Sequence, residues 1–134
     1  MRTLILLIAC LTVLVTPVVA DDDIAAAQTV IRSQERAMIS DDAATAYSYA
    51  GPPITSMYRE AETFMWMVRR GYAPVYRHQS FEFGAGRILG DQITQEVHIN
   101  DAEGVAWEAL YTLEQQSDGS WKIISCVLSK AVGA

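Results

Sequence analysis

Apolar side chains recur at helical spacing through the first half of the chain beyond residue 20. Ile24, Ala27 and Ile31 share one stripe, while polar residues occupy the opposite face, which is typical of a helix packed on a core. Gly51 and two prolines then interrupt the pattern, because proline cannot continue a helix. We expect three helices, from Asp22 or Asp23 to the polar break at 40–42, over Ala43–Ala50, and from Thr55 or Ser56 to Arg70, followed by an extended connector over Tyr72–Tyr76.

The second half changes to a period of two, which is the alternation of half-buried strands. Turn residues at Asn100–Gly104 and at Asp118-Gly119 separate the apolar runs. We expect four strands: one around Phe81 and Phe83, one over 93–99, one over 105–113, and one over 121–128.

Alternation also assigns each strand residue to a face of the sheet. The residues expected to face the helices are Phe81, Phe83, Ile93, Gln95, Val97, Ile99, Val105, Trp107, Ala109, Tyr111 and Leu113. The same parity places His78, His98, Glu96 and Glu108 on the outside, and turns Ile124, Cys126 and Leu128 to the open outer face of the last strand. With both histidines in water and no ligand spacing around them, we predict no metal site.

Helices followed by an antiparallel meander predict an α+β fold, with N-terminal helices packed on a curved four-stranded antiparallel sheet. Because long strands twist, the sheet is expected to curl around the helices and form a cone that opens between helix and sheet. The segment 21–134 is long enough for one domain with a core of its own.

The first 20 residues have the layout of a secretory signal peptide. Arg2 precedes an apolar run, Leu4–Val15, and Ala20 stands at the expected cleavage point before three aspartates. The run is too short to cross a membrane as a helix of about 20 residues. We therefore expect a single domain over 21–134, cleaved after Ala20 and periplasmic or secreted.

The net charge limits the classes of partner, and the cysteine content limits disulfide formation. Residues 21–134 carry nine Lys and Arg against 16 Asp and Glu, a net charge of −7, which argues against a nucleic acid or an anionic membrane surface as partner. Cys126 is the one cysteine left after cleavage, so no intramolecular disulfide is expected. A buried, inert thiol is the simpler interpretation, and a reactive or intermolecularly paired thiol is the alternative.

Two stretches carry a family resemblance. The run Phe64–Arg77, FMWMVRRGYAPVYR, resembles the central motif of an exported bacterial family catalogued as domain of unknown function 4864, and 107–114 with 118–123 resemble its C-terminal hairpin. The resemblance covers nearly all of the chain after residue 20. It implies the cone-shaped nuclear transport factor 2-like fold, although a hairpin of fuller members between the second and third helices is not evident here. It implies no activity.

Aromatic and arginine side chains cluster around the predicted junction of helix and sheet. Arginine over aromatic rings suits a carboxylate-bearing or planar ligand at the mouth of the cone, whereas covering the core edge is the structural alternative. We also expect Met57, Met65 and Met67 to fill the core, with an adaptable pocket as the alternative. The candidate ligand-binding residues are Trp66, Arg70, Tyr72, Tyr76, Trp107 and Tyr111; we predict no catalytic residue, metal or cofactor.

Three hypotheses follow for the function. The first is a non-catalytic module that binds a small ligand or an envelope protein. The second is a cone-pocket enzyme, similar to an isomerase or dehydratase, which would need a buried carboxylate near a tyrosine. The third is a structural or dimer-forming envelope protein whose open sheet face is the interface.

We predict that the exported form begins at Asp21. After expression of the full chain in a Gram-negative bacterium, the intact mass of the periplasmic protein should correspond to residues 21–134. Ala20→Tyr should block cleavage, because the peptidase accepts only small side chains there. Recovery of the unprocessed mass from the wild-type chain would contradict the prediction.

Overall fold

The computed structural model describes residues 19–132, and their strands form a four-stranded antiparallel sheet in the order β1-β2-β3-β4. The helices are α1 (Val19–Ile39), α2 (Ala43–Ser48), α3 (Pro52–Met57), α4 (Ala61–Gly71) and α5 (Ala73–Tyr76). The strands are β1 (His78–Leu89), β2 (Gln92–Asp101), β3 (Ala106–Gln115) and β4 (Trp121–Lys130). The predicted signal peptide lies outside the described residues, except that Val19 and Ala20 begin α1.

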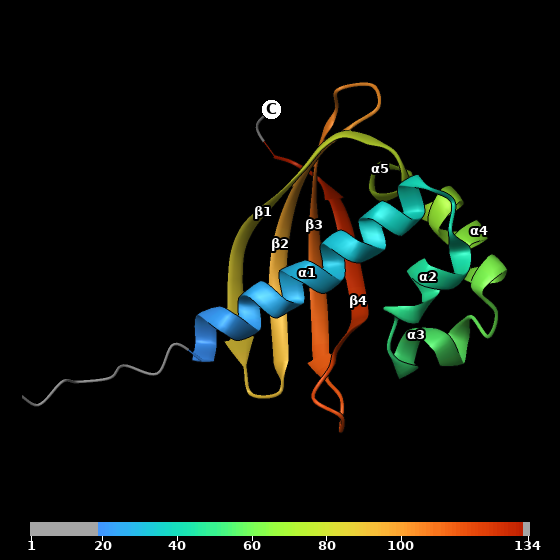
Figure 1. The fold of residues 1–134 in the computed structure, drawn as a ribbon. Coiled ribbons are helices and arrows are strands. Elements are labelled where there is room, and N and C mark those ends of the chain that lie inside the picture. Colours follow the sequence, from blue (N-terminus) through green and yellow to red (C-terminus); the bar gives the residue numbers. More distant parts are fainter. Residues whose placement is uncertain (1–18, 133–134) are drawn as a thin grey trace, which may run out of the picture.

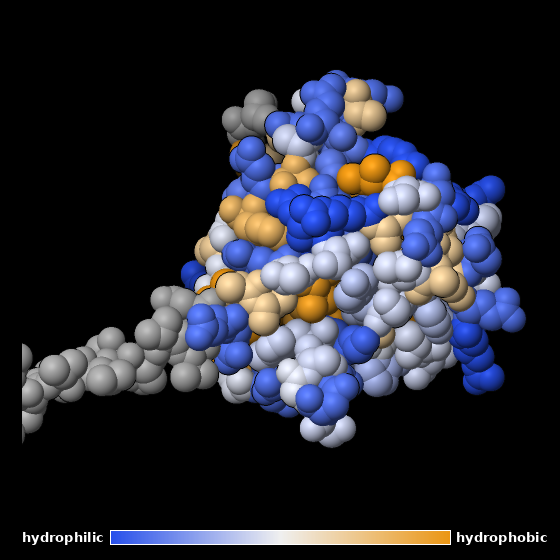
Figure 2. Space-filling model, in the orientation of Figure 1, coloured by the Kyte–Doolittle hydropathy of each residue, from blue (hydrophilic) through white to orange (hydrophobic). Residues whose placement is uncertain are grey.

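Helix α1 lies across one face of the sheet, and α2, α3 and α4 gather beyond β4 at one end of it (Figure 1). The predicted order of helices and then a strand meander is confirmed, including both predicted turns, where Gly104 and Gly119 have positive φ angles. The face that α1 covers shows small, separate apolar patches in a mainly hydrophilic surface (Figure 2). Within residues 19–132, no helix is long and apolar enough to span a bilayer.

The core lies between α1 and the concave side of the sheet. Ile31 of α1, Met65 of α4 and Tyr111 of β3 are among the largest side chains that are fully buried there. Burying an aliphatic side chain of this size stabilises a fold by about 2 kcal/mol. The predicted inward residues of β2 and β3 are confirmed, whereas Val105 precedes β3 and is exposed.

The predicted third helix is in fact two helices. Pro52 starts α3 earlier than expected, because its fixed φ suits the first helical turn, where its missing N–H costs nothing. The chain leaves helical geometry at Tyr58, whose carbonyl accepts a 2.6 Å hydrogen bond from the Tyr47 hydroxyl, and resumes at Ala61. The predicted extended connector contains the short helix α5. These breaks let the helical layer bend around the end of β4.

The prediction for His78 is wrong because of an irregularity in β1. His78 pairs with Asp101 and Ser80 pairs with Asn100, so Gln79 is an extra residue that reverses the alternation. The His78 side chain therefore points to the core side and is only 5% exposed. His98 and Glu108 do face outward as predicted, and their side chains are more than half exposed.

A second irregularity overturns the predicted outer face of β4. Thr112 pairs with Ser125 and Leu113 pairs with Ile123, which leaves Ile124 as the extra residue. Beyond it, Cys126 and Leu128 pair with the inward residues Tyr111 and Ala109 and pack against the core. The outward apolar residue of this stretch is instead Val127, which is 59% exposed.

Candidate functional site

A cavity of about 210 Å³ lies between the helices and the end of the sheet formed by β3 and β4. Three methionines line it, one each from α1, α3 and α4: Met38, Met57 and Met67. Met57 is largely exposed, so it lies at the mouth, and Met65 is buried in the core. Unbranched, polarizable methionine side chains adapt to ligands of different shape.

The rest of the wall is mainly aromatic and aliphatic. Its polar side chains are Gln34 of α1, Ser125 and Cys126 of β4, and the tyrosines Tyr58, Tyr72 and Tyr111. None of the described lining residues carries a charge at neutral pH. Such a lining, mostly apolar with a few polar groups, is typical of a small-molecule site.

Burial has the largest effect on the pKa of two groups that line this cavity, Tyr111 and Cys126. Burial, and after it the neighbouring Cys126 thiol, raise the pKa of Tyr111 well above its ordinary value. Burial likewise raises the pKa of the Cys126 thiol to about 12, against a smaller opposite effect of Tyr111. Both groups are therefore neutral near pH 7, and the thiol is a poor nucleophile.

The structure divides the six candidate residues among several places. Tyr72 and Tyr111 line the cavity. Arg70 and Trp107 line a neighbouring hollow of about 520 Å³, which shares Tyr72 and Cys126 with the cavity. The role predicted for these residues in ligand binding stays a prediction.

Two of the six lie away from both hollows. Trp66 is 56% exposed, and the Arg70 guanidinium stacks over its ring at 4.6 Å. Tyr76 donates a hydrogen bond to the carboxylate of Asp41. Sequence spacing put all six near one junction, but α4 turns Trp66 outward on the face opposite Phe64 and Val68.

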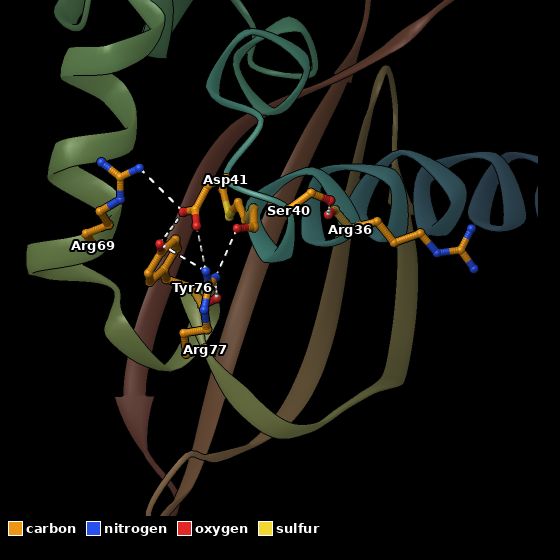
Figure 3. A network of polar contacts seen from close by, with 7 residues as sticks. Arg36, Ser40, Asp41, Arg69, Tyr76 and Arg77 are labelled. Carbon is orange, nitrogen blue, oxygen red and sulfur yellow. Dashed lines mark hydrogen bonds and ion pairs between the residues drawn. The ribbon is translucent and has the colours of Figure 1, made fainter.

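Asp41 anchors the helices that form the cavity wall (Figure 3). It follows α1 with a φ of 54°, a left-handed geometry that usually favours glycine. The N–H groups of Asp42 and Asp41 donate to the carbonyls of Ala37 and Met38, which makes the turn a Schellman motif. A carboxylate is thus presented where glycine is the commoner residue.

Side chains from α4 and the α5 region converge on that carboxylate (Figure 3). Arg77 donates to Oδ2 at 3.0 Å, and Arg69 donates to Oδ1 at 3.4 Å. The Tyr76 hydrogen bond, followed by the charges of Arg77 and Arg69, outweighs burial and holds the pKa of Asp41 below its usual range. The cluster ties the end of α1 to the segment that carries Tyr72 and Val75 into the cavity.

Sequence reasoning missed a buried acid–histidine pair. Glu35 of α1 is 8% exposed at its side chain, and its Oε1 lies 2.8 Å from Nε2 of His78. Its other oxygen accepts a hydrogen bond from Arg32, which also donates to the carbonyl of Phe81 at 3.1 Å. Glu35 lies next to the stripe of Ile31 and Met38, and the pairing with His78 follows only from the extra residue in β1.

Both ring nitrogens of His78 contact oxygen atoms of other elements. Nδ1 lies 3.0 Å from the carbonyl oxygen of Pro74, and Nε2 faces the Glu35 carboxylate. Neither Glu35 nor His78 is among the residues that line the cavity. The pair joins α1, α5 and β1.

Comparisons with known proteins agree with the fold. The family model described as a domain of unknown function (DUF4864) matches residues 20–134. A solved structure of an NTF-2 like protein of unknown function from Silicibacter pomeroyi DSS-3 is similar, with a TM-score of 0.50 and 16% identity over 83% of this chain and 98% of that chain. The likeness confirms the nuclear transport factor 2-like fold. No protein of curated function matches this chain.

We predict that Glu35→Gln lowers the free energy of unfolding by about 2 kcal/mol at pH 6, because a charged partner of two hydrogen bonds is lost. Burial raises the pKa of Glu35, but the hydrogen bonds from His78 and Arg32 outweigh it, so this pKa lies below its ordinary 4.5. The stabilisation is therefore present above about pH 4.5 and is lost as the pH falls through the folded-state pKa. Urea unfolding between pH 3 and 6 measures the difference.

The exposed Glu62→Gln variant is the control for this series. It should follow the wild-type curve, since Glu62 starts α4 on the surface. A wild-type advantage over Glu35→Gln that persists unchanged at pH 3 would argue that the pair does not depend on an ionised Glu35.

We also predict that Cys126 resists thiol reagents. A pKa of about 12, against an ordinary 9.0, lowers the thiolate fraction roughly 1,000-fold. In the form beginning at Asp21, labelling by a disulfide reagent at pH 8 should be at least about 100-fold slower in the native protein than in urea. Equal rates would show that the thiol is accessible and the interpretation of an inert thiol wrong.

Proposed function

The chain belongs to the family described as a domain of unknown function (DUF4864), and we propose that it acts as a non-catalytic binding module that holds a small apolar molecule. The cavity lined by Met38, Met67 and Tyr111 carries this proposal, because it is apolar, partly enclosed and uncharged among its described lining residues. The signal-like N-terminus supports an exported, periplasmic or secreted setting for it.

The size of the cavity limits the ligand. An apolar protein cavity of about 150 Å³ is large enough to hold benzene. At about 210 Å³, this one suits a single ring with one or two substituents, or a short branched chain. A larger molecule would extend toward the hollow of Arg70 and Trp107, which shares Tyr72 with the cavity. Those residues stay in the proposal as an outer part of the site.

The other two hypotheses have less support. A cone-pocket enzyme needs an acid or base at its cavity, but the buried Glu35 and His78 are not among the described lining residues, and both are engaged in hydrogen bonds between elements. A sheet-face dimer needs an apolar patch, yet Leu110 and Val127 are paired on an outer face that also carries Glu108, His98 and Glu96.

We predict saturable binding of p-cresol or p-xylene to the purified form beginning at Asp21. Ligands of this size should bind with a Kd on the order of 0.1–1 mM, measured by NMR titration. Val68→Phe places a phenyl ring in the cavity and should weaken binding at least about tenfold, while changing stability by no more than about 2 kcal/mol.

The matched control is Val105→Phe, at an exposed position that lines none of the hollows described above. It should bind both probes like the wild type. Absence of saturable binding by either probe to the wild type, together with a ligand-free native mass spectrum of protein taken from its own exported compartment, would refute the proposal.

A further inference from the structure

Gln34 is an unusual residue for the wall of an apolar cavity. It lies on α1, is 4% exposed, and is one of the residues that line the space beside Met38 and Tyr111. A buried amide carries one acceptor oxygen and two N–H donors, and leaving such groups unpaired destabilises a fold. Its hydrogen bonds therefore indicate what the cavity can receive.

The orientation of the Gln34 amide is fixed by its neighbour. Its Nε2 donates a 3.2 Å hydrogen bond to the carbonyl oxygen of Ala46 in α2. A carbonyl can only accept, so the nitrogen must face Ala46, and the oxygen Oε1 must point the other way.

That oxygen has no partner within residues 19–132, since Gln34 takes part there in its one bond to Ala46. Within the same residues, every side-chain oxygen or nitrogen that is buried from solvent has a hydrogen-bond partner. Because the Gln34 oxygen is unpaired, it must be accessible from open space. The open space next to this buried residue is the cavity. The wall thus presents a hydrogen-bond acceptor in an apolar setting.

The uncharged lining of the cavity excludes charged ligands from this position. No lysine, arginine, histidine or carboxylate is among the described lining residues, and the Tyr111 and Cys126 groups are neutral near pH 7. A buried ligand charge would find no partner of opposite sign, which is strongly unfavourable. A carboxylate would also repel the Gln34 oxygen.

We infer that the ligand is a small, neutral, mainly apolar molecule with a hydroxyl or N–H group that donates a hydrogen bond to Oε1 of Gln34. This rests on the proposed function and specifies its ligand class. Phenols, alcohols and indoles belong to that class, whereas hydrocarbons and carboxylates do not. A bound hydrocarbon of the same size leaves the amide oxygen unpaired, so Gln34 selects for a donor.

The test compares p-cresol with p-xylene, which differ in a hydroxyl against a methyl group. The quantity measured is the ratio of the two Kd values, by NMR titration, in the wild type and in Gln34→Met. Methionine keeps the length of the side chain but has no strong acceptor. The ratio Kd(p-xylene)/Kd(p-cresol) should fall about fivefold in Gln34→Met, the factor that one net hydrogen bond supports.

Two further variants protect this comparison. Gln34→Leu repeats the loss of the acceptor if Gln34→Met is poorly folded, and the Ala46 carbonyl keeps its bond from the Tyr49 N–H in both. Met67→Leu alters the lining without changing its hydrogen-bonding groups, so it should shift both Kd values by a similar factor and leave their ratio unchanged.

The outcomes separate the two proposals. Binding of both probes, with a ratio that Gln34→Met and Gln34→Leu leave unchanged, would overturn the role of Gln34 and leave the binding function standing. Failure of both probes to bind the wild type, together with the ligand-free native mass spectrum described above, would instead remove the proposed function. A ratio that falls in the Gln34 variants but not in Met67→Leu supports the assignment of the ligand class.

Discussion

The side chains of a β-strand alternate strictly between two faces, and only an extra residue in the pairing can reverse that order. Extra residues of this kind fall at Gln79 and at 84–85 in β1, and at Ile124 in β4. The first turns His78 into the core, and the last turns Cys126 toward the cavity. Three local departures from regular pairing therefore decide which side chains of β1 and β4 face the inside of the cone.

The irregularity at 84–85 in β1 shows how the fold accommodates an extra residue. Gln95 is fully buried beside it, and its Nε2 donates to the carbonyls of Gly84 and Glu96. Gln28 of α1 donates in turn to the Gln95 oxygen. At Gly86, an added Cβ would lie 2.6 Å from that oxygen, so a larger residue there would force the hydrogen-bonded Gln95 side chain to shift. A buried amide thus satisfies the backbone that the irregularity frees.

Helix α1 divides polar groups between the core and the cavity. Glu35 joins His78 and Arg32, while its neighbour Gln34 holds Ala46 and presents its oxygen to the cavity. At the end of the same helix, Asp41 draws Arg69, Tyr76 and Arg77 together. One helix therefore supports the sheet, fixes the position of α4 and α5, and supplies one of the polar groups of the wall. The charged groups stabilise the packing of the helices on the sheet, and the described residues that line the cavity are uncharged.

The sequence determined the features that depend on local pattern. Spacing of three to four residues gave the face of α1, alternation gave the inward residues of β2 and β3, and glycine at positions 104 and 119 gave the turns, because these signals lie within a few residues of each other. The run from Phe64 to Arg77 indicated the family, and through it the cone fold.

Only the tertiary structure decided which groups meet. Whether β1 takes an extra residue depends on its register with β2, and the break at Tyr58 depends on a hydrogen bond from Tyr47. Tyr72 and Tyr111, which the sequence offered as candidates because aromatic residues near the junction suit a lining, do line the cavity, and their role in binding stays a prediction. Gln34 and Glu35 were not such candidates, because a polar residue in a helix shows its partner only once the other elements have packed against it.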